Sequence, residues 1–152
     1  MTSKQELTIK KKKLQKRNSI MELQDSIMEF VDGENIVKGD SEVFPLEHTF
    51  TDGIYIRQMS MKKDSFVIGK IHKHNHVWFL LTGEISVADE NNTVDHVAPC
   101  YVEAPAGSKR MIYAHEDSVW VNIHANPTNT QDLQELEELI IAKDYEEFNN
   151  KK

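Results

Sequence analysis

The sequence predicts an all-β fold, a small antiparallel β-barrel with a short helix at each end. Between about residues 43 and 124, short runs rich in β-branched and aromatic residues are separated by turn signals such as Thr51-Asp52-Gly53. No helical pattern interrupts these runs, and closely spaced strands of this kind are typical of antiparallel sandwiches and barrels. Helical periodicity is confined to residues 20–31 and 131–148.

The chain of 152 residues has the length of one domain with appendages. Strands are predicted at 43–50, 54–61, 66–72, 76–88, 94–104, 109–114 and 118–124. We divide the chain into a basic flexible leader at 1–17, an N-terminal helix and linker at 18–42, the barrel at 43–127, and an acidic C-terminal amphipathic helix at 128–152.

The leader differs in charge from the rest of the chain. Residues 1–17 carry seven Lys or Arg residues and one acid, which leaves 11 basic and 24 acidic residues elsewhere. Blocks of like charge are usually disordered interaction tails, so we predict a mobile leader that is either solvated or bound to an acidic partner. The acidic remainder argues against nucleic-acid binding by the barrel.

The two terminal helices are predicted from capping signals and apolar spacing. Ser19 and Glu22 have the spacing of a capping box, and Asp32-Gly33 marks the helix end. At the other terminus, Asn129 or Thr130 caps a helix with an apolar stripe of Leu133, Leu136, Ile140 and Phe148. Such a stripe either covers the barrel or mediates self-association. We predict a homodimer or higher closed oligomer, because the stripe offers more apolar surface than one thin barrel covers.

Histidines are concentrated in the predicted barrel. Six of the seven lie between residues 72 and 124, and three of them are His72, His74 and His76. Imidazole is the commonest protein ligand for transition metals, so the cluster predicts a site for Zn, Fe, Ni, Mn or Cu. The alternative is a polar pocket without metal, in which the histidines bond to one another and to water.

The same region resembles the cupin superfamily, whose two short motifs place three histidines and one glutamate around a metal inside a small jelly-roll β-barrel. Gly83 matches the glycine that ends the first motif, and Pro105-Ala106-Gly107 matches the second. The resemblance then places His72 at the second histidine and His76 at the glutamate. Lys70 stands at the first histidine, Arg110 at the histidine of the second motif, and Ala114 at its asparagine. Of the four metal-ligand positions of the family, only two therefore hold a metal-binding residue in this sequence, His72 and His76.

Hairpin geometry supplies a third ligand. If His115-Glu116-Asp117 is a hairpin turn, antiparallel pairing sets Arg110 opposite residues 123–124, so His124 reaches the level of the missing ligand. Side-chain alternation places Trp120 on the face of His124 and Trp78 on the face of His76. We predict a metal site of His72, His76 and His124, with His74 as an optional fourth ligand.

Beyond these motifs, residues 44 to about 145 resemble small cupin-like proteins encoded in tailed-phage and prophage genomes. The matching segments are 44–48, 54–57, 69–74, 107–110 and 113–120, with His76 and His124. The resemblance implies no established activity. It places the protein in the cytoplasm of a host cell or in a virion, and it makes a virion component a candidate partner for the leader.

Arg110 suggests what the pocket binds. A guanidinium cannot ligate a metal but offers a fork suited to carboxylate or phosphate. We therefore predict a substrate-binding set of Arg110, Arg57, Trp78 and Trp120 for a small anionic molecule. The alternative is an ion pair of Arg110 with Glu103, Glu116 or Asp117.

Two functions remain open at this point. The first is a metal-dependent enzyme or small-molecule binder, whose general base would be His74, Glu103 or Tyr101. The second is a non-enzymatic phage binding or structural module that uses the barrel as a scaffold. No apolar run approaches the length of a membrane span, and the single Cys100 can form neither an internal disulfide nor a zinc finger.

Overall fold

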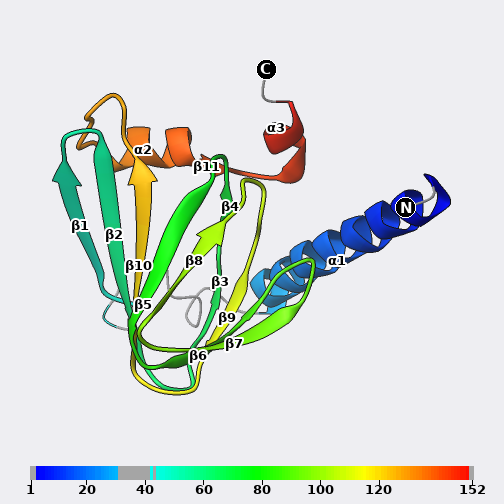
Figure 1. The fold of residues 1–152 in the computed structure, drawn as a ribbon, viewed down its shortest axis with the longest axis horizontal. Helices are drawn as coiled ribbons and strands as arrows, with labels where there is room; N and C mark the ends of the chain where they lie inside the picture. The colour runs from blue at the N-terminus through cyan, green and yellow to red at the C-terminus, as the bar shows by residue number, and fades with distance from the viewer. Residues whose placement is uncertain (1–2, 31–41, 43, 151–152) are drawn as a thin grey trace.

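The computed structural model describes residues 3–30, 42 and 44–150, and within them the chain forms an antiparallel barrel with helices outside it (Figure 1). The elements in chain order are α1 (Ser3–Phe30), β1 (Leu46–Thr51), β2 (Ile54–Met61), β3 (Phe66–Ile68), β4 (Ile71–His72), β5 (His76–Thr82), β6 (Glu84–Ala88), β7 (Thr93–Val97), β8 (Cys100–Ala104), β9 (Met111–Ala114), β10 (Ser118–Ala125), α2 (Leu133–Ile140), β11 (Ile141–Ala142) and α3 (Tyr145–Asn149).

Two sheets form the walls of the barrel. One has the strand order β1-β2-β10-β5-β8 and the other β3-β9-β6-β7, while β11 and β4 form a short ribbon between them and the C-terminal helices. The strand pairs are antiparallel. The predicted all-β barrel is confirmed, with helices toward both ends of the chain. Among residues 3–30 and 44–150, no helix has the length and hydrophobicity that crossing a membrane requires.

Three of the predicted strands are each divided in two. The 66–72 run breaks at Gly69, the 76–88 run at Gly83, and the 94–104 run at Pro99. Each break lets the chain move from one sheet to another, for example from β5 to β6, which lie in different sheets. At Gly83 the buried positions change parity, from Trp78 and Leu80 before it to Ile85 and Val87 after it, so the prediction of one continuous strand there is wrong.

Gly83 makes the sharp turn between β5 and β6 possible. Its φ is +89°, and a Cβ built there would lie 2.1 Å from Ser118 Oγ and 2.6 Å from the Asp117 carbonyl oxygen. Both the backbone angle and the close approach of β10 therefore require glycine.

Replacing Gly83 with alanine is expected to lower the free energy of unfolding by at least about 2 kcal/mol, because the left-handed backbone and the clash act together. Gly53→Ala is the matched control, since Gly53 also has a positive φ of +72° but its Cβ would meet nothing within 4 Å. We expect it to cost about 1 kcal/mol. Urea unfolding of both variants measures the difference, and equal losses would contradict the assigned clash.

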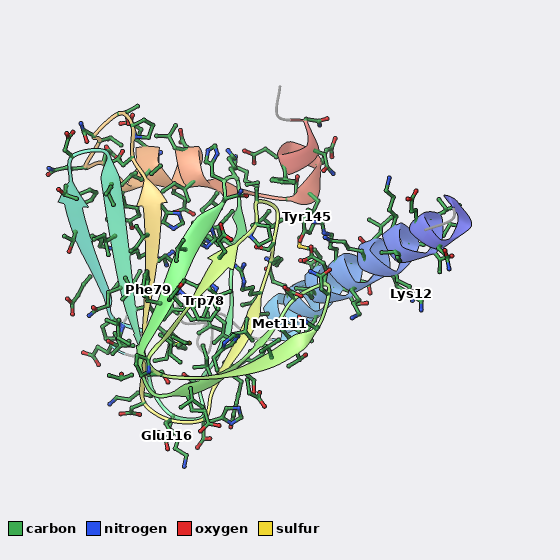
Figure 2. All side chains as sticks on the ribbon, viewed as in Figure 1. Lys12, Trp78, Phe79, Met111, Glu116 and Tyr145 are labelled. Carbon is green, nitrogen blue, oxygen red and sulfur yellow. The ribbon has the colours of Figure 1, made fainter. Side chains whose placement is uncertain are left out.

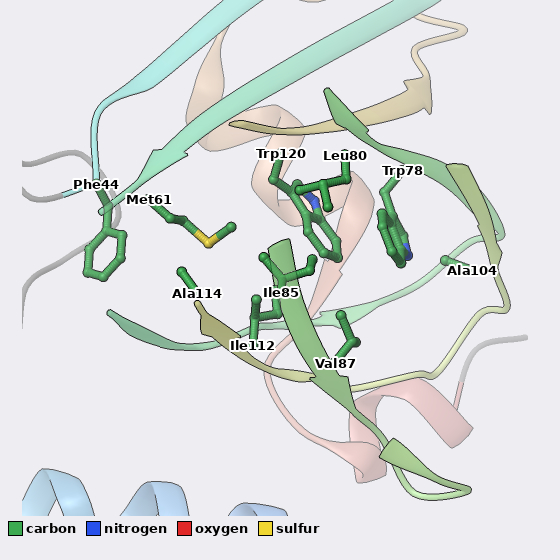
Figure 3. Packing of buried hydrophobic residues seen from close by; sticks show 10 residues of the cluster. All are labelled: Phe44, Met61, Trp78, Leu80, Ile85, Val87, Ala104, Ile112, Ala114 and Trp120. Carbon is green, nitrogen blue, oxygen red and sulfur yellow. The ribbon is translucent and has the colours of Figure 1, made fainter. Parts of the chain in front are cut away.

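The apolar core fills the space between the two sheets (Figure 3). Trp78 and Trp120 stack at its centre, with ring centroids 4.0 Å apart. Around them pack Phe44, Met61, Leu80, Ile85, Val87, Ala104, Ile112 and Ala114. This core supports the end of the barrel at which β4, β11 and α2 lie.

The N-terminal helix is longer than the sequence indicated. It begins at Ser3, so residues 3–17 are helical and the predicted start at about residue 20 is wrong. Ser19 does not cap the helix, because its hydroxyl donates to the Gln15 carbonyl in the preceding turn at 3.0 Å. Lys, Leu, Gln and Arg favour helix, which explains why the charged run continues it. The predicted stop at Asp32-Gly33, with the linker to 41, lies outside the described residues.

The single C-terminal helix is also corrected. Asp132, rather than Asn129 or Thr130, caps α2, and its carboxylate accepts from the Gln134 and Glu135 amides. The chain then forms β11 before Asp144 caps α3. Leu136 and Ile140 are buried against Tyr55 of the same chain, so this part of the predicted stripe covers its own barrel.

Candidate metal centre

Three histidines from three strands meet near the end of the barrel that α2 covers. His72 comes from β4, His76 from the start of β5, and His124 from the end of β10. The ligand atoms of all three lie within 4.8 Å of one another. Their ring centroids are 4.1 Å apart for His72 and His76, 4.8 Å for His76 and His124, and 5.1 Å for His72 and His124.

Strand register explains this convergence. On the β5–β10 ladder Ile123 pairs with Val77, so the next step aligns His124 with His76 on the inner face. His72 is held from the other side, because it pairs with Ile141 of β11 and its carbonyl accepts from the Gly107 amide at 2.8 Å. The predicted convergence of His124 is therefore present, but the hairpin that led to it is wrong. β9 and β10 lie in different sheets.

Burial keeps these imidazoles neutral. All three are at most 8% exposed. Desolvation lowers the pKa of His76 to about 4, helped by the charge of Arg110. Desolvation also lowers the pKa of His124 to about 3, with contributions from His76, Arg57 and His74. The pKa of His72 is lowered well below its usual value, mainly by desolvation and then by His76. Neutral imidazole is the form that binds a metal.

Two buried nitrogens of the cluster have no hydrogen-bond partner among the described residues, namely His72 Nδ1 and His76 Nε2. Buried polar atoms are normally satisfied, so these two nitrogens are available to a metal ion. Three neutral imidazoles at this spacing, two of which have an unsatisfied nitrogen, fit a divalent transition metal, because a His₃ set is a known protein donor set for zinc. The donor set does not distinguish one such metal from another.

His74 lies outside this group. It is exposed in the turn between β4 and β5, and it does not belong to the set of ligand atoms within 4.8 Å. Its backbone carbonyl lies 3.4 Å from His76 Nδ1, which helps to orient that ring. The structure therefore brings three of the four predicted ligands together.

A cavity of about 580 Å³ opens beside His72 and His124. Its wall on the α2 side is apolar and contains Leu133, Leu136 and Ile140. Its polar lining includes Arg57, Lys70 and Glu137, of which Lys70 and Glu137 form an ion pair. The cavity thus combines a buried histidine cluster with an apolar wall and a cationic edge.

Arg57 faces both this cavity and a smaller one of about 100 Å³. Its Nε is buried without a hydrogen-bond partner among the described residues. The charge of Arg57 lies close enough to lower the pKa of both His72 and His124. An anion in the cavity would find this guanidinium donor available.

Arg110 lines only the smaller of these two cavities, together with Trp120. It is 8% exposed, and desolvation lowers its pKa while Asp89 and Glu90 raise it. The acids that act on it are thus not Glu103, Glu116 or Asp117, and Asp117 pairs with Lys62 instead. Arg110 still acts on the histidines, because its charge lowers the pKa of His72 and His76.

The two predicted tryptophans differ in position, and only Trp120 lines a cavity with Arg57 and Arg110. Trp78 is 1% exposed in the stacked core and lines none of the described cavities, whereas Trp120 reaches the small cavity. The structure therefore does not bring Trp78 into the larger cavity.

His48 and Tyr55 also belong to the site, although neither was predicted from the sequence as a site residue. Both line the larger cavity, and the Tyr55 hydroxyl shares a hydrogen bond of 2.8 Å with His48 Nδ1. The Tyr55 ring stacks on that of His124 at 6.0 Å, and desolvation raises its pKa. The signal was present, because pairing about the Thr51-Asp52-Gly53 turn sets His48 opposite Arg57.

Neither a family model nor a curated protein matches the sequence. Solved structures do match. Ectoine synthase from P. lautus is 12% identical over 64% of this chain and 73% of that chain, with a TM-score of 0.51. KdgF from a Halomonas species is 13% identical over 63% of this chain and 92% of that chain, with a TM-score of 0.50. The domain is a cupin-like β-barrel. A Cupin 2 conserved barrel domain protein from Salinispora arenicola also matches, with 12% identity over 65% of this chain and 87% of that chain and a TM-score of 0.49.

These identities show the fold and leave the activity open. The cupin-like barrel carries a histidine triad suited to a divalent metal ion. That triad departs from the four-ligand pattern of the superfamily motifs, since it has no carboxylate.

Proposed function

We propose that this chain is a metal-binding cupin-like protein of the type encoded by tailed phages, and that it binds or transforms an anionic small molecule in the histidine-lined cavity. The observation that carries the proposal is the convergence of His72, His76 and His124, with two unsatisfied nitrogens, beside a cavity of about 580 Å³. The similarity of several sequence segments to phage-encoded proteins supports the proposed type. The fold accommodates catalysis, because ectoine synthase is an enzyme by name.

The ligand's anionic character is inferred from Arg57. Its unpartnered Nε is a donor for a carboxylate or phosphate oxygen, and burial strengthens such a contact. The apolar wall of α2 would cover the remainder of the molecule and exclude water. A metal bound by the histidines would supply Lewis-acid polarisation of a ligand oxygen.

Tyr55 and His48 are the groups best placed to move a proton. A hydrogen bond joins the hydroxyl of the buried Tyr55 to His48, which is half-buried. Tyr55 can donate its hydroxyl proton to a ligand group and recover one through His48. These two replace His74, Glu103 and Tyr101 as our candidates for acid–base chemistry.

The proposal is tested by the metal content of protein purified without a polyhistidine tag. We expect close to one divalent transition metal ion per chain by elemental mass spectrometry. Fully folded protein that takes up no such ion, even after equilibration with zinc or iron(II), would refute the metal-binding function. It would favour the second candidate function, a non-enzymatic binding module. The helix α1, which projects from the barrel, supports that candidate (Figure 1).

Anion binding has its own expected result. Arg57→Met should weaken binding of a simple carboxylate probe, malonate, by roughly tenfold or more, because a buried charge-assisted hydrogen bond is lost. Isothermal titration measures the affinity, and Lys63→Met, at an exposed position far from the cavity lining, is the control. Equal affinities for the two variants would exclude Arg57 from the anion site.

A further inference from the structure

The smaller cavity beside the histidines, of about 100 Å³, is lined by two arginines. Arg57 lies on β2, and Arg110 directly precedes β9, whose first residue Met111 is labelled in Figure 2; β2 and β9 belong to different sheets. Within the described part of the chain, neither arginine forms an ion pair and no carboxylate lines this cavity. Asp89 and Glu90 act on Arg110 from outside the lining. Buried charges are normally paired, so the two guanidinium groups fit an anionic group supplied by a ligand.

Asn122 adds a neutral donor to the same cavity. Its side-chain oxygen accepts a hydrogen bond of 3.0 Å from Trp120 Nε1. An indole N–H can only donate, so this bond fixes which end of the amide is the oxygen and leaves the NH₂ group for a ligand. The polar groups of the small cavity thus present donors from two charged side chains and one neutral side chain. An ionised carboxylate, which only accepts hydrogen bonds, matches this lining.

A carboxylate matches the small cavity better than a phosphate does. Proteins commonly bind phosphate through backbone N–H groups at the N-terminus of a helix. Among the described residues, no helical residue lines this cavity, and the N–H of its glycine, Gly69, already donates to the Arg110 carbonyl at 2.8 Å. The cavity therefore offers side-chain donors, and the guanidinium fork suits the two oxygens of a carboxylate.

The larger cavity adjoins the small one, because Arg57, Lys70 and His72 line both. Lys70 pairs with Glu137, so these two side chains add no net charge to the larger cavity. Its wall on the α2 side is formed by apolar side chains, namely Leu133, Leu136 and Ile140. A molecule whose charged group lies between the arginines would therefore meet an apolar surface on leaving the small cavity.

We propose that the ligand of this site is an amphipathic carboxylate. Its head group lies in the small cavity between Arg57 and Arg110, and its apolar tail lies along α2 in the larger cavity. This inference rests on the proposed function of the same site and adds the chemical class of the ligand. The donors that hold the head group belong to the chain itself, so binding of the carboxylate does not depend on a metal ion.

The ligand class is tested by isothermal titration of the full chain with acetate, octanoate and octanamide. Each methylene buried against the apolar wall should tighten binding by about three- to fourfold, so octanoate should bind at least about 100-fold more tightly than acetate. Octanamide has a similar tail and a neutral head group, and it should bind roughly tenfold more weakly than octanoate or worse, because charge-assisted hydrogen bonds are lost. The same order of affinities is expected with a chelator present.

Three results of these titrations would overturn the proposal. Equal affinities for octanoate and acetate would exclude the apolar tail, and equal affinities for octanoate and octanamide would exclude the charged head group. Octanoate binding that disappears with the chelator would place the head group on a metal ion and not between the arginines. Octyl phosphate, if it bound more tightly than octanoate, would replace the carboxylate as the head group.

Two variants of α2 test where the tail lies. Leu133→Gln should weaken octanoate binding by about threefold or more and leave acetate binding unchanged, because it places an amide in the apolar wall. Leu139→Gln is the matched control, since Leu139 lies on the same helix and is 40% exposed, compared with 45% for Leu133, but does not line the cavity. Equal effects of the two variants on octanoate binding would contradict the assigned position of the tail.

Arg110→Met tests the head group. It should reduce the preference for octanoate over octanamide by roughly threefold or more, because one of two guanidinium donors is lost. An unchanged preference in a folded variant would exclude Arg110, and if the variant does not fold, the wild-type comparison with octanamide decides the head group. The proposed function can fail separately. Protein that binds octanoate as expected but takes up no metal would refute only metal binding, whereas malonate binding without a preference for octanoate over acetate would refute only the amphipathic class.

Discussion

Replacing His124 with alanine is expected to lower the affinity of the protein for a divalent transition metal by roughly 100-fold or more. Loss of a residue that only orients a ligand costs about 10–100-fold, and His124 is a direct ligand in the proposed site. Its ring lies 4.8 Å from His76 and 5.1 Å from His72, so no other described histidine replaces it in the cluster. Competition with a chromogenic chelator measures the affinity.

His74→Ala is the control, because it shows whether removal of any histidine in this region lowers the metal affinity. His74 is exposed, two residues from His76, and outside the group of ligand atoms. We expect the affinity of this variant to change by less than about threefold, well below the roughly 10–100-fold cost of losing an orienting residue, because alanine keeps the backbone carbonyl that orients His76. If His74→Ala lost the metal and His124→Ala kept it, the assigned triad would be wrong. Circular dichroism of both variants checks that the barrel remains folded.

The sequence identified two of the three clustered histidines through motif spacing. His72 and His76 lie on either side of one short turn, so their proximity is a local property. His124 depends on which distant strands pair, and no pattern in a single sequence reports that β10 lies between β2 and β5. His124 was predicted correctly, but from a β9–β10 hairpin that does not exist. Alternation did correctly place Trp120 and His124 on one buried face.

The terminal helices show a second reason why local sequence patterns did not predict the structure. In α1, helix propensity and the Glu90 ion pairs outweighed the repulsion between lysines, whereas charge alone had predicted a mobile segment. In the C-terminal segment, pairing of Ile141 with His72 interrupted an apolar stripe that was continuous in sequence. Both outcomes depend on tertiary contacts, which override local preference. The same contacts bring α2 over the cavity and create its apolar wall.

Acid should destabilise the metal-free protein through the same histidines. The unfolded chain titrates its histidines near pH 6.5, but in the folded protein the pKa is about 4 for His76 and about 3 for His124. Below pH 6.5 the unfolded chain therefore binds protons that the folded protein excludes, so the free energy of unfolding falls as the pH falls. At pH 5 the loss is about 2 kcal/mol for each of these two histidines, relative to pH 7.5. The decline continues until the folded-state pKa values are reached.

Urea unfolding at pH 7.5 and pH 5, with a chelator present, measures this loss. Other groups also titrate in this range, so the informative quantity is the difference between wild type and a His76→Gln/His124→Gln double variant. Glutamine keeps a polar side chain but has no titrating group, so the variant should lose the part of the pH dependence that His76 and His124 contribute, about 4 kcal/mol between the two pH values, while His72 keeps its own. Its stability at pH 7.5 is a separate quantity and does not enter the comparison. If wild type and double variant lost equal free energy between the two pH values, the histidines would not be buried in neutral form, and the physical basis of the proposed metal site would fail with them.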